Sequence, residues 1–543
     1  MQPSVRRAEL FPTFQSSRHS LLPMTISETA STGRMPVLGV LPLDSSADCA
    51  PHQKSSQGAG GSLLRSTPLD DVGARVLRSN DLGDYAVLTR DEHQRLAANP
   101  LDIADDRRRD LESRSLLESS PRSTWSHLEE AAYATRKSFA LEGPSLHIFV
   151  VTLRCDHSCQ YCQVSRASVN ATGFDMSPED AALAVERTFD SPSQNLTIEF
   201  QGGEPALRFD LVRHIVALAE ARNAEAGRNL SFAMVSTLHH LSDEDLAFCH
   251  DHRIRLSTSI DGSQTLHDRQ RPNPTRDAWQ RTVDAIGRAR AVLGHDGISA
   301  LPTISRAALS DPQGLVDQYR DLGFPSIFLR PISPYGFALK TRKAIGYEVE
   351  DFIVFYEAAL DHILELNAAG VAMEETYAAI LLRHILTPFH SGYLDLRSPA
   401  GAGLGVLVYN YDGRVFPADE ARMAAKTGDA RFTMGHVSDS FDALMSSEAM
   451  RWLMTGSVSE VLPGCAECAF VPFCGSDPVF HATVQGDPAA ERRGTDFCRK
   501  HTAMFRLLFN RIADGNPETM RTFVSWALRK PRDDVSVAGW VDR

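Results

Sequence analysis

The chain has little cysteine, fewer basic than acidic residues, and no long hydrophobic segment. Among 543 residues there are nine cysteines, and 69 Asp and Glu against 56 Lys and Arg give a formal net charge of −13. This acidic balance argues against a protein that binds the phosphate backbone of nucleic acid. No run of 18 or more apolar residues occurs, so the sequence predicts no transmembrane helix and no membrane partner.

The N-terminus also lacks a compact apolar segment followed by a cleavage site, so we expect a cytoplasmic protein. In a reducing cytoplasm, clustered cysteines indicate metal or catalytic sites rather than disulfides. Seven of the nine cysteines fall into two groups, one near residue 158 and one between residues 465 and 498. Of the other two, Cys49 lies in a tail and Cys249 in a helix-like segment, where we expect an exposed thiol and a small packing residue.

Composition and periodicity divide the chain into six segments. Residues 1–65 are rich in Ser, Pro, Gly and Thr without a sustained period, which predicts disorder. Residues 66–140 read as strand, turn, strand and helix, a small α+β domain whose helix begins at Thr89 with Glu92 completing a capping box. The remaining segments are a barrel-like α/β region, a helical linker, an irregular cysteine-rich domain and two C-terminal helices, at 145–345, 346–400, 401–505 and 506–543.

The α/β region carries the clearest pattern. Six apolar, strand-like runs alternate with amphipathic helical stretches, from "LHIFVVTL" at residue 146 to "SIFLRPI" at residue 326. Such alternation predicts a parallel sheet covered by helices, here a partial (β/α)6 barrel. Ligands of these folds bind at the carboxyl ends of the strands, so residues that follow each strand are candidate site residues.

The first cysteine group lies directly after the first predicted strand. "LRCDHSCQYCQVSR" places Cys155, Cys159 and Cys162 in a C-x3-C-x2-C pattern. Three thiolates can hold three corners of a [4Fe–4S] cluster and leave one iron open. A structural zinc site is the alternative, but such a site requires four protein ligands, and His157 is the only local candidate for the fourth.

The pattern C-x3-C-x-aromatic-C after a first strand resembles the signature of the radical S-adenosylmethionine (SAM) enzymes, with Tyr161 at the aromatic place. The resemblance implies a [4Fe–4S] cluster whose open iron binds SAM. It implies that one electron cleaves SAM to methionine and a 5′-deoxyadenosyl radical, which abstracts a hydrogen atom from the substrate.

Other motifs of that family follow in order after later strands. "QGGEP" follows the second strand, "STSIDG" ends the fourth, and an arginine lies twelve residues after the serine of "STSIDG". The resemblance implies that the first motif binds the SAM amino group, that the serine and the arginine bind its carboxylate, and that the aspartate lies near the ribose. These residues are Gly202, Gly203, Glu204, Ser259, Asp261 and Arg271. Taken alone, "GGEP" also fits a plain turn, and the arginine a solvated side chain.

The second cysteine group has a C-x2-C-x5-C pattern with a fourth cysteine 24 residues later: Cys465, Cys468, Cys474 and Cys498. By chemistry alone, four thiolates could close either a zinc or an iron–sulfur site. The group resembles the SPASM extension of radical SAM peptide maturases, which carries two auxiliary clusters. Here Pro478 and Ala418 occupy two places where that pattern has cysteine, so the resemblance implies that one auxiliary [4Fe–4S] cluster is retained.

The region from residue 70 to 505 resembles the radical SAM maturases of His-Xaa-Ser systems. This implies a peptide or protein substrate with His-Xaa-Ser repeats, a second radical SAM protein as partner, and a reductant such as flavodoxin or ferredoxin. The small domain at 66–140 is either a module that recruits the peptide as an added strand or a packing appendage.

The catalytic residues beyond the cofactors are not fixed by any motif. Asp419 and Glu420 are carboxylates expected near the barrel mouth, where one could act as general base, or both could be a solvated or capping pair. We expect His157 and His481 not to be ligands. Two other functions stay open, a radical SAM enzyme acting on a small molecule and a non-catalytic metal-binding scaffold for a partner maturase.

Overall fold

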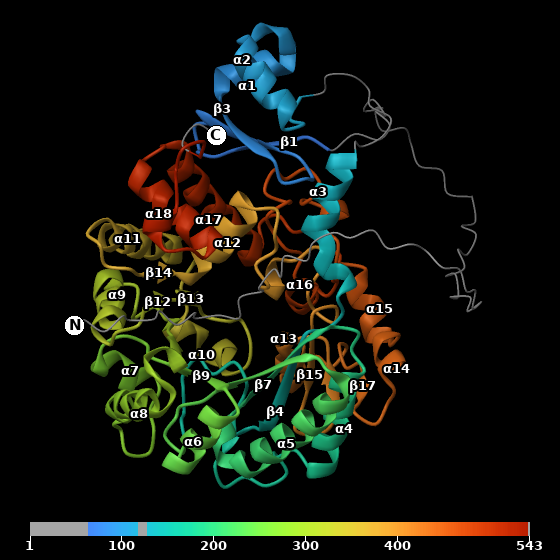
Figure 1. Ribbon diagram of the computed structural model, residues 1–543, viewed down its shortest axis with the longest axis vertical. Coiled ribbons are helices and arrows are strands. Elements are labelled where there is room, and N and C mark those ends of the chain that lie inside the picture. Colours follow the sequence, from blue (N-terminus) through green and yellow to red (C-terminus); the bar gives the residue numbers. More distant parts are fainter. Residues whose placement is uncertain (1–62, 118–126, 541–543) are drawn as a thin grey trace, which may run out of the picture. The chain divides into compact units, whose positions relative to one another are not determined.

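The structure is a computed structural model that describes residues 63–117 and 127–540 (Figure 1). The predicted disordered tail lies outside the described residues as far as residue 62, and Cys49 lies outside with it. The last residue assigned to that tail, Arg65, already begins strand β1.

The N-terminal region is a three-stranded antiparallel sheet followed by helices. The sheet has the order β1-β2-β3, and the predicted capping box at Thr89 and Glu92 opens the first helix. The elements are β1 (Arg65–Pro68), β2 (Arg75–Ser79), β3 (Tyr85–Thr89), α1 (Arg90–Ala98), α2 (Asp105–Ser113) and α3 (His127–Lys137).

This small sheet is bonded to the cysteine-rich region 400 residues further along the chain. The Arg65 Nε donates a hydrogen bond of 2.6 Å to the carbonyl of Ala466, and the Ser79 hydroxyl donates one of 2.6 Å to the carbonyl of Ala469. The backbone N–H of Ala469 in turn donates to the Thr67 hydroxyl at 3.1 Å. These contacts fix the sheet against the loop that carries the first two cysteines of the second group.

The predicted alternation of strands and helices is confirmed. Five parallel strands adjoin in the order β10-β9-β8-β7-β4. The next strand along the chain, β11, pairs in parallel with β13 in a separate two-stranded sheet. The strands are β4 (Leu146–Thr152), β7 (Asn195–Gly202), β8 (Asn229–Val235), β9 (Ile254–Ser259), β10 (Ile298–Leu301), β11 (Thr303–Ile304) and β13 (Arg330–Pro331). A second short parallel pair is β12 (Ser326–Ile327) with β14 (Glu374–Glu375).

Helices connect these strands and cover the sheet. In Figure 1, α4, α5 and α6 run along one face of the sheet, and their apolar side chains belong to the same buried cluster as the strand residues. The connecting helices are α4 (Pro178–Phe189), α5 (Phe209–Ala226), α6 (Asp243–Asp251), α7 (Gln264–Gln270), α8 (Ala278–Leu293), α9 (Pro312–Asp321) and α10 (Phe337–Ile345).

The structure adds three strands to this sheet from a region that we expected to be irregular. β15 pairs in parallel with β4 on the side away from β7, and an antiparallel meander of β16 and β17 follows it. Their bounds are β15 (Val406–Tyr409), β16 (Arg414–Phe416) and β17 (Gly435–His436). The expectation missed β15 because its four apolar residues, bracketed by glycine and turn residues, are too short a run to show a period.

The rest of the C-terminal half is largely helical. Two helices lie in the segment predicted as a linker, and four occupy the cysteine-rich region. Of the two terminal helices predicted at 506–543, the first begins earlier, at Asp496 within the cysteine-rich segment. The helices are α11 (Val349–Ala368), α12 (Thr376–Leu386), α13 (Asp419–Lys426), α14 (Phe441–Met445), α15 (Glu448–Met454), α16 (Pro478–Gln485), α17 (Asp496–Ala513) and α18 (Pro517–Leu528). Within the described ranges, none of the helices combines the length and the apolar character needed to cross a membrane.

Candidate functional site

The three-cysteine loop begins where β4 ends, as the sequence predicted. Cys155 lies in the short strand β5 (Arg154–Cys155), which pairs with β6 (Ala167–Ser168), and the two other cysteines lie in the loop between these strands. Cys155 is 8% exposed, and all three thiols are free. Burial raises the pKa of Cys155 well above its usual value and that of Cys159 to about 11, and neighbouring thiols of the group add to both shifts.

Gly202 and Gly203 are required by the approach of two backbones. A Cβ atom on Gly202 would lie 2.1 Å from the Thr152 carbonyl oxygen, and one on Gly203 would lie 2.3 Å from that of Arg154. The backbone N–H groups of Gly203 and Glu204 donate hydrogen bonds of 2.8 Å to these same two carbonyls. The glycine pair therefore binds the end of β7 to the chain that enters Cys155.

Glu204 is fully buried and its carboxylate is held inside the protein. It accepts hydrogen bonds from the Ser236 hydroxyl at 2.6 Å, the Thr237 backbone N–H at 2.7 Å and the Ala206 N–H at 3.0 Å. Glu204 thus ties the end of β7 to the residues that follow β8.

Tyr161 joins the cysteine loop to the end of the fourth barrel strand. Its hydroxyl donates to the carboxylate of Asp261 and accepts a hydrogen bond of 2.8 Å from the Arg271 guanidinium. The other oxygen of Asp261 accepts from the Thr303 N–H at 3.1 Å, so both oxygens have partners within the protein. Burial raises the pKa of Asp261, although Arg271 and Tyr161 oppose this shift. Ser259, the last residue of β9, lies two residues before Asp261.

The predicted SAM-binding residues therefore meet at one edge of the sheet, at the carboxyl ends of β4, β7 and β9. Their assignment to individual groups of SAM stays a prediction.

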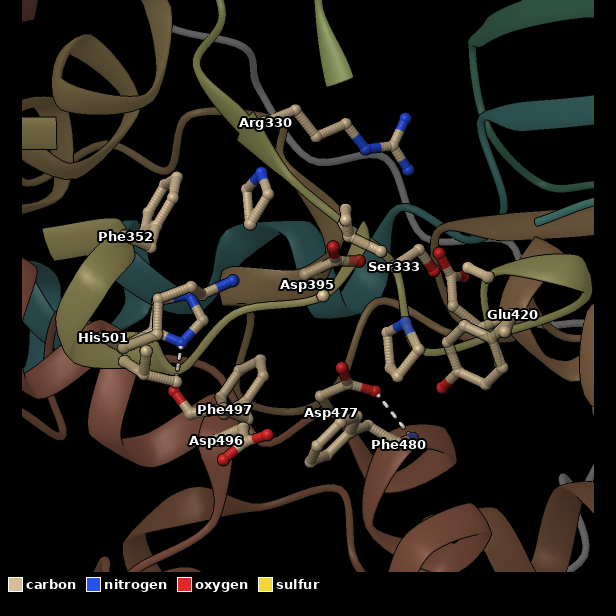
Figure 2. A pocket seen from close by; sticks show the side chains of 18 of the residues that line it. Arg330, Ser333, Phe352, Asp395, Glu420, Asp477, Phe480, Asp496, Phe497 and His501 are labelled. Carbon is tan, nitrogen blue, oxygen red and sulfur yellow. Dashed lines mark hydrogen bonds between the residues drawn. The ribbon is translucent and has the colours of Figure 1, made fainter. Parts of the chain in front are cut away.

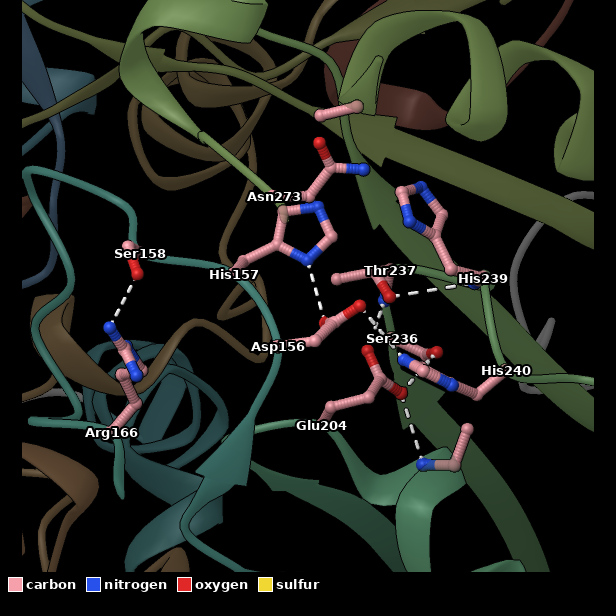
Figure 3. Close-up of polar contacts among 12 residues, drawn as sticks. Asp156, His157, Ser158, Arg166, Glu204, Ser236, Thr237, His239, His240 and Asn273 are labelled. Atoms are coloured by element: carbon pink, nitrogen blue, oxygen red, sulfur yellow. Dashed lines mark hydrogen bonds and ion pairs between the residues drawn. The ribbon is translucent and has the colours of Figure 1, made fainter. Parts of the chain in front are cut away.

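Sequence analysis named His157 but missed two further histidines beside the cysteine loop, His239 and His240. Asp156 accepts hydrogen bonds from His157 at 2.8 Å and from His240 at 2.9 Å, and the ring of His157 lies 4.8 Å from that of His239 (Figure 3). Burial raises the pKa of Asp156, but the two histidine hydrogen bonds outweigh it and hold the pKa below the usual range. The adjacent pair "HH" after β8 was the available signal. Through His240, Asp156 fastens the loop to the segment after β8.

The second cysteine group also converges. Cys465, Cys468 and Cys474 lie in turns before α16, and Cys498 lies in the first turn of α17. Burial raises the pKa of Cys465 to about 12 and that of Cys474 well above its usual value, and the other thiols of the group contribute to each shift.

The spacing of the sulfur atoms bears on the kind of group that either site could hold. Across the part of the chain that the structure describes, no three cysteine sulfurs all lie within 4.8 Å of one another; the one set of three ligand atoms that close comes from Cys155, Asp156 and His157. Four thiolates on one zinc, at a Zn–S distance of about 2.3 Å, would lie about 3.8 Å apart by tetrahedral geometry.

A cavity of about 200 Å³ lies between elements that contact the two cysteine groups, and Figure 2 shows the side chains that line it. One wall is the segment from Ser333 to Arg342, which contacts the first cysteine group. The Phe337 N–H donates a hydrogen bond of 2.8 Å to the Cys162 carbonyl, and the Thr341 hydroxyl donates one of 2.7 Å to the Gln160 carbonyl. The opposite wall comes from α16 and α17, next to the second group.

The two candidate bases differ in their surroundings. Asp419 forms an ion pair of 2.7 Å with the buried Arg422 on its own helix, so its charge is compensated. Glu420 lines the cavity with Asp395 and Asp477, and desolvation together with these neighbouring carboxylates raises its pKa. Sequence analysis missed Asp395 and Asp477, because nothing local distinguishes them from other loop aspartates.

Comparison with known proteins places this geometry in a family context. Residues 149–310 match the family model of the Radical SAM superfamily. The matched range includes the three-cysteine loop, the glycine pair and the ends of β8 and β9.

Two solved structures share the fold over most of the chain. Hexahistidine-tagged anSMEcpe with bound AdoMet has a TM-score of 0.58 at 16% identity and covers 74% of this chain and 98% of its own. Native anSMEcpe with bound AdoMet and Kp18Cys peptide has a TM-score of 0.57 at 16% identity and covers 71% and 100%. At this identity the likeness shows the fold.

Two relatives match by sequence over shorter stretches. A cysteine-type anaerobic sulfatase-maturating enzyme of Clostridium novyi is 30% identical over 122 residues, which are 22% of this chain and 32% of that enzyme. An uncharacterized protein of Methanocaldococcus jannaschii is 27% identical over 132 residues, 24% of this chain and 43% of that protein. The chain thus spans less than half the length of either relative.

The backbone contact at Gly203 gives a first prediction. Gly203→Ala should lower the free energy of unfolding by about 1–3 kcal/mol, because the new methyl group meets carbonyl oxygens that cannot yield without moving β5. Gly287→Ala is the matched control, since Gly287 lies in α8 and a Cβ there meets nothing within 4 Å. This substitution should leave the stability unchanged or raise it. Chemical denaturation measures both, and equal stability of the two variants would contradict the account.

A second prediction concerns the Tyr161 hydroxyl. Tyr161→Phe should cost about 1–3 kcal/mol of unfolding free energy, because it leaves buried Asp261 with one oxygen unpaired. Tyr411→Phe loses only a long contact of 3.4 Å with exposed Lys426 and should change stability by less than about 0.5 kcal/mol. Thermal or chemical unfolding compares the pair, and a Tyr161→Phe protein as stable as Tyr411→Phe would show that the hydroxyl anchors nothing.

Proposed function

We propose that this chain is a radical SAM enzyme that modifies a ribosomally synthesised peptide or protein. The observation that carries the proposal is the convergence of the three-cysteine loop, the glycine pair, Ser259 and Arg271 at the carboxyl ends of parallel strands, beside a cavity that opens between the two cysteine groups.

The residues fit the cofactors that the domain implies. Cys155, Cys159 and Cys162 would hold a [4Fe–4S] cluster through three irons, leaving one iron for SAM. Their buried thiols would lose their protons on binding iron, because the metal charge offsets the desolvation that raises their pKa. When bound, the cluster supplies one electron that cleaves SAM to methionine and a 5′-deoxyadenosyl radical.

The protein's own groups would orient SAM. Gly202 and Gly203 bring backbone groups to the end of β7, Ser259 and Arg271 offer a hydroxyl and a planar guanidinium fork for the SAM carboxylate, and Tyr161 fixes the direction of that fork. Glu204 and Asp261 use their carboxylates within the protein, so we assign them to positioning the ends of β7 and β9.

The second group would hold one auxiliary [4Fe–4S] cluster through Cys465, Cys468, Cys474 and Cys498. Four thiolates can close an iron–sulfur cluster as well as a zinc site, and the resemblance to the SPASM extension favours the cluster. With four protein ligands it has no open iron for substrate, so its role would be to accept or relay an electron on the far side of the cavity.

A proton acceptor would be needed if the product is formed by loss of a proton after oxidation. Glu420 suits this role better than Asp419, because it faces the cavity and has no ion-pair partner among the described residues, whereas Asp419 is paired with Arg422. Its raised pKa favours proton uptake near neutral pH.

The substrate class rests on the resemblance and on the neighbours. Curated and structural neighbours include a sulfatase-maturating enzyme and anSMEcpe bound to a peptide, which favours a polypeptide over a small metabolite. The finer proposal is a protein with His-Xaa-Ser repeats, modified together with a second radical SAM protein and supplied with electrons by a flavodoxin or ferredoxin in the cytoplasm. The sheet β1-β2-β3 could recruit the peptide, although its bonds to Ala466 and Ala469 also give it a packing role.

The proposal predicts SAM cleavage that depends on the first cysteine group. Anaerobically reconstituted protein with SAM and dithionite should release 5′-deoxyadenosine, and Cys159→Ala should abolish the release because one cluster ligand is lost. Cys249→Ala is the control, since that cysteine is buried in α6 away from both groups and should leave the release unchanged.

The same assay separates the alternatives. Release that rises on adding a peptide with His-Xaa-Ser repeats, and not a shuffled peptide, supports a peptide maturase. Release that no peptide increases points to a small-molecule substrate, and no release with intact SAM binding points to a scaffold.

A further inference from the structure

The cavity between the two cysteine groups is lined by three carboxylates from distant parts of the chain. Asp395 lies in the turn after α12, Glu420 in the first turn of α13, and Asp477 at the N-cap of α16. Figure 2 shows the three side chains directed toward the same space. Their approach is therefore a product of the tertiary fold.

The backbone holds Asp477 in this position at a cost. Its φ of 35° lies in the left-handed region, which a residue with a side chain rarely adopts. One oxygen of Asp477 accepts a hydrogen bond of 3.0 Å from the Phe480 N–H, and this cap fixes the carboxylate at the cavity wall.

The cavity holds more negative than positive charge. Among the described residues, none of the three carboxylates has an ion-pair partner. The lining carries the carboxylates of Asp395, Glu420, Asp477 and Asp496 and the basic groups of Arg330, Arg342 and Lys500. Lys500 acts on both Asp395 and Asp477, and Arg342 is paired at 3.6 Å with Asp496 at the rim. Desolvation and mutual repulsion raise the pKa of Glu420 and Asp477, which expresses the cost of holding these charges without a partner.

A second feature of the wall also lacks a partner. The Tyr335 side chain is 3% exposed and lines the cavity, and its hydroxyl has the Thr483 side chain as a neighbour but makes no hydrogen bond of normal geometry in the described structure. All three carboxylates raise the pKa of this hydroxyl, so it lies within electrostatic range of each. A buried polar group without a partner costs free energy that a bound ligand can recover.

The remaining wall is aromatic. Phe352, Tyr377, Tyr393, Phe480 and Phe497 surround the acidic groups. Aromatic faces attract a cation most strongly when it is desolvated, and they exclude water that would otherwise screen the carboxylates.

We propose that this cavity is a specificity pocket that binds a cationic side chain of the substrate polypeptide, an imidazolium, guanidinium or ammonium group. The cation would lie between Asp395, Glu420 and Asp477, whose negative charge Arg330 and Lys500 balance only in part, with the Tyr335 hydroxyl as a further hydrogen-bond acceptor. The inference rests on the proposed function, since it takes the substrate to be a peptide. It places the recognised side chain between the two cysteine groups.

Binding is tested with probes that differ in one side chain. The probes are capped peptides acetyl-Gly-Gly-Xaa-Gly-Gly-amide with His, Arg, Lys or Gln at Xaa. They are titrated calorimetrically into the anaerobically reconstituted full chain without reductant, at pH 6, where the His probe is charged, and at pH 8.5, which lies above the raised pKa of Glu420, about 8, and of Asp477, about 7. At least one basic peptide should bind about tenfold more tightly than the Gln peptide, because charge-assisted hydrogen bonds are lost with Gln. The tightest of the three identifies the cation.

Two variants remove charge without removing structure. Asp477→Asn retains a side chain that caps α16 and tolerates the left-handed backbone, and Glu420→Gln retains shape. Each should reduce the preference for the basic peptide toward that for Gln. Asp361→Asn on α11, whose aspartate pairs with Arg511 outside the cavity, is the matched control and should keep the full preference.

The outcomes separate this inference from the proposed function. Equal affinity for basic and Gln peptides, no binding of any basic peptide, or an unchanged preference in both cavity variants would overturn the pocket. Because the titration needs no SAM cleavage, a protein that binds the basic peptide but releases no 5′-deoxyadenosine would keep the pocket and refute the proposed chemistry. A protein that releases 5′-deoxyadenosine but binds basic and Gln peptides equally would refute the pocket and keep the proposed chemistry.

Discussion

The approach of the Gly202–Gly203 backbone to the end of β4 is the contact on which the candidate site depends. It leaves no room for a Cβ atom, and it aligns two N–H groups with the carbonyls of Thr152 and Arg154 immediately before Cys155. Glu204 extends this connection to β8, and Tyr161 with Asp261 and Arg271 extends it to β9. A loop that must present three thiols in one place is thereby fixed to the ends of four parallel strands.

The same logic of pairing explains the region between the two cysteine groups. Buried thiols and carboxylates are costly unless a cation, a metal or a hydrogen-bond donor compensates them. Asp419 forms an ion pair with Arg422, and Asp156 accepts hydrogen bonds from two histidines. The cysteines and the cavity carboxylates of Asp395, Glu420 and Asp477 have no such cationic partner among the described residues. In this molecule, thiols and partly buried carboxylates without an ion-pair partner among the described residues mark the places where cofactors and substrate are proposed to bind.

Much of the fold could be predicted from the sequence because its signals are local. The capping box at Thr89 and Glu92 involves four consecutive residues, and the six barrel strands appear as apolar runs between amphipathic helices. β15 escaped because four residues show no period, although it pairs with β4 in the middle of the sheet. The assignment of 401–505 as irregular was for that reason too coarse.

The candidate site shows the same difference between local signals, which the sequence reveals, and long-range contacts, which it does not. The two cysteine groups could be found because their spacing along the chain reflects one binding task. The cavity could not be found, since Asp395, Asp477 and Lys500 are separated by tens of residues and only the packing of α13, α16 and α17 brings them together. The histidines after β8 gave a weak signal, and their contact with Asp156 depends on how the cysteine loop folds back.

Iron and acid-labile sulfide per chain, measured after anaerobic reconstitution, test the central claim most directly. The account predicts about eight irons, falling to about four both in the Cys155/Cys159/Cys162→Ala variant and in the Cys465/Cys468/Cys474/Cys498→Ala variant. About four irons in the unaltered protein, all lost in the first variant, would leave the second group without a cluster and remove its electron-relay role. No iron at all would contradict the account, since neither cysteine group would then hold the cofactor on which the proposed chemistry depends.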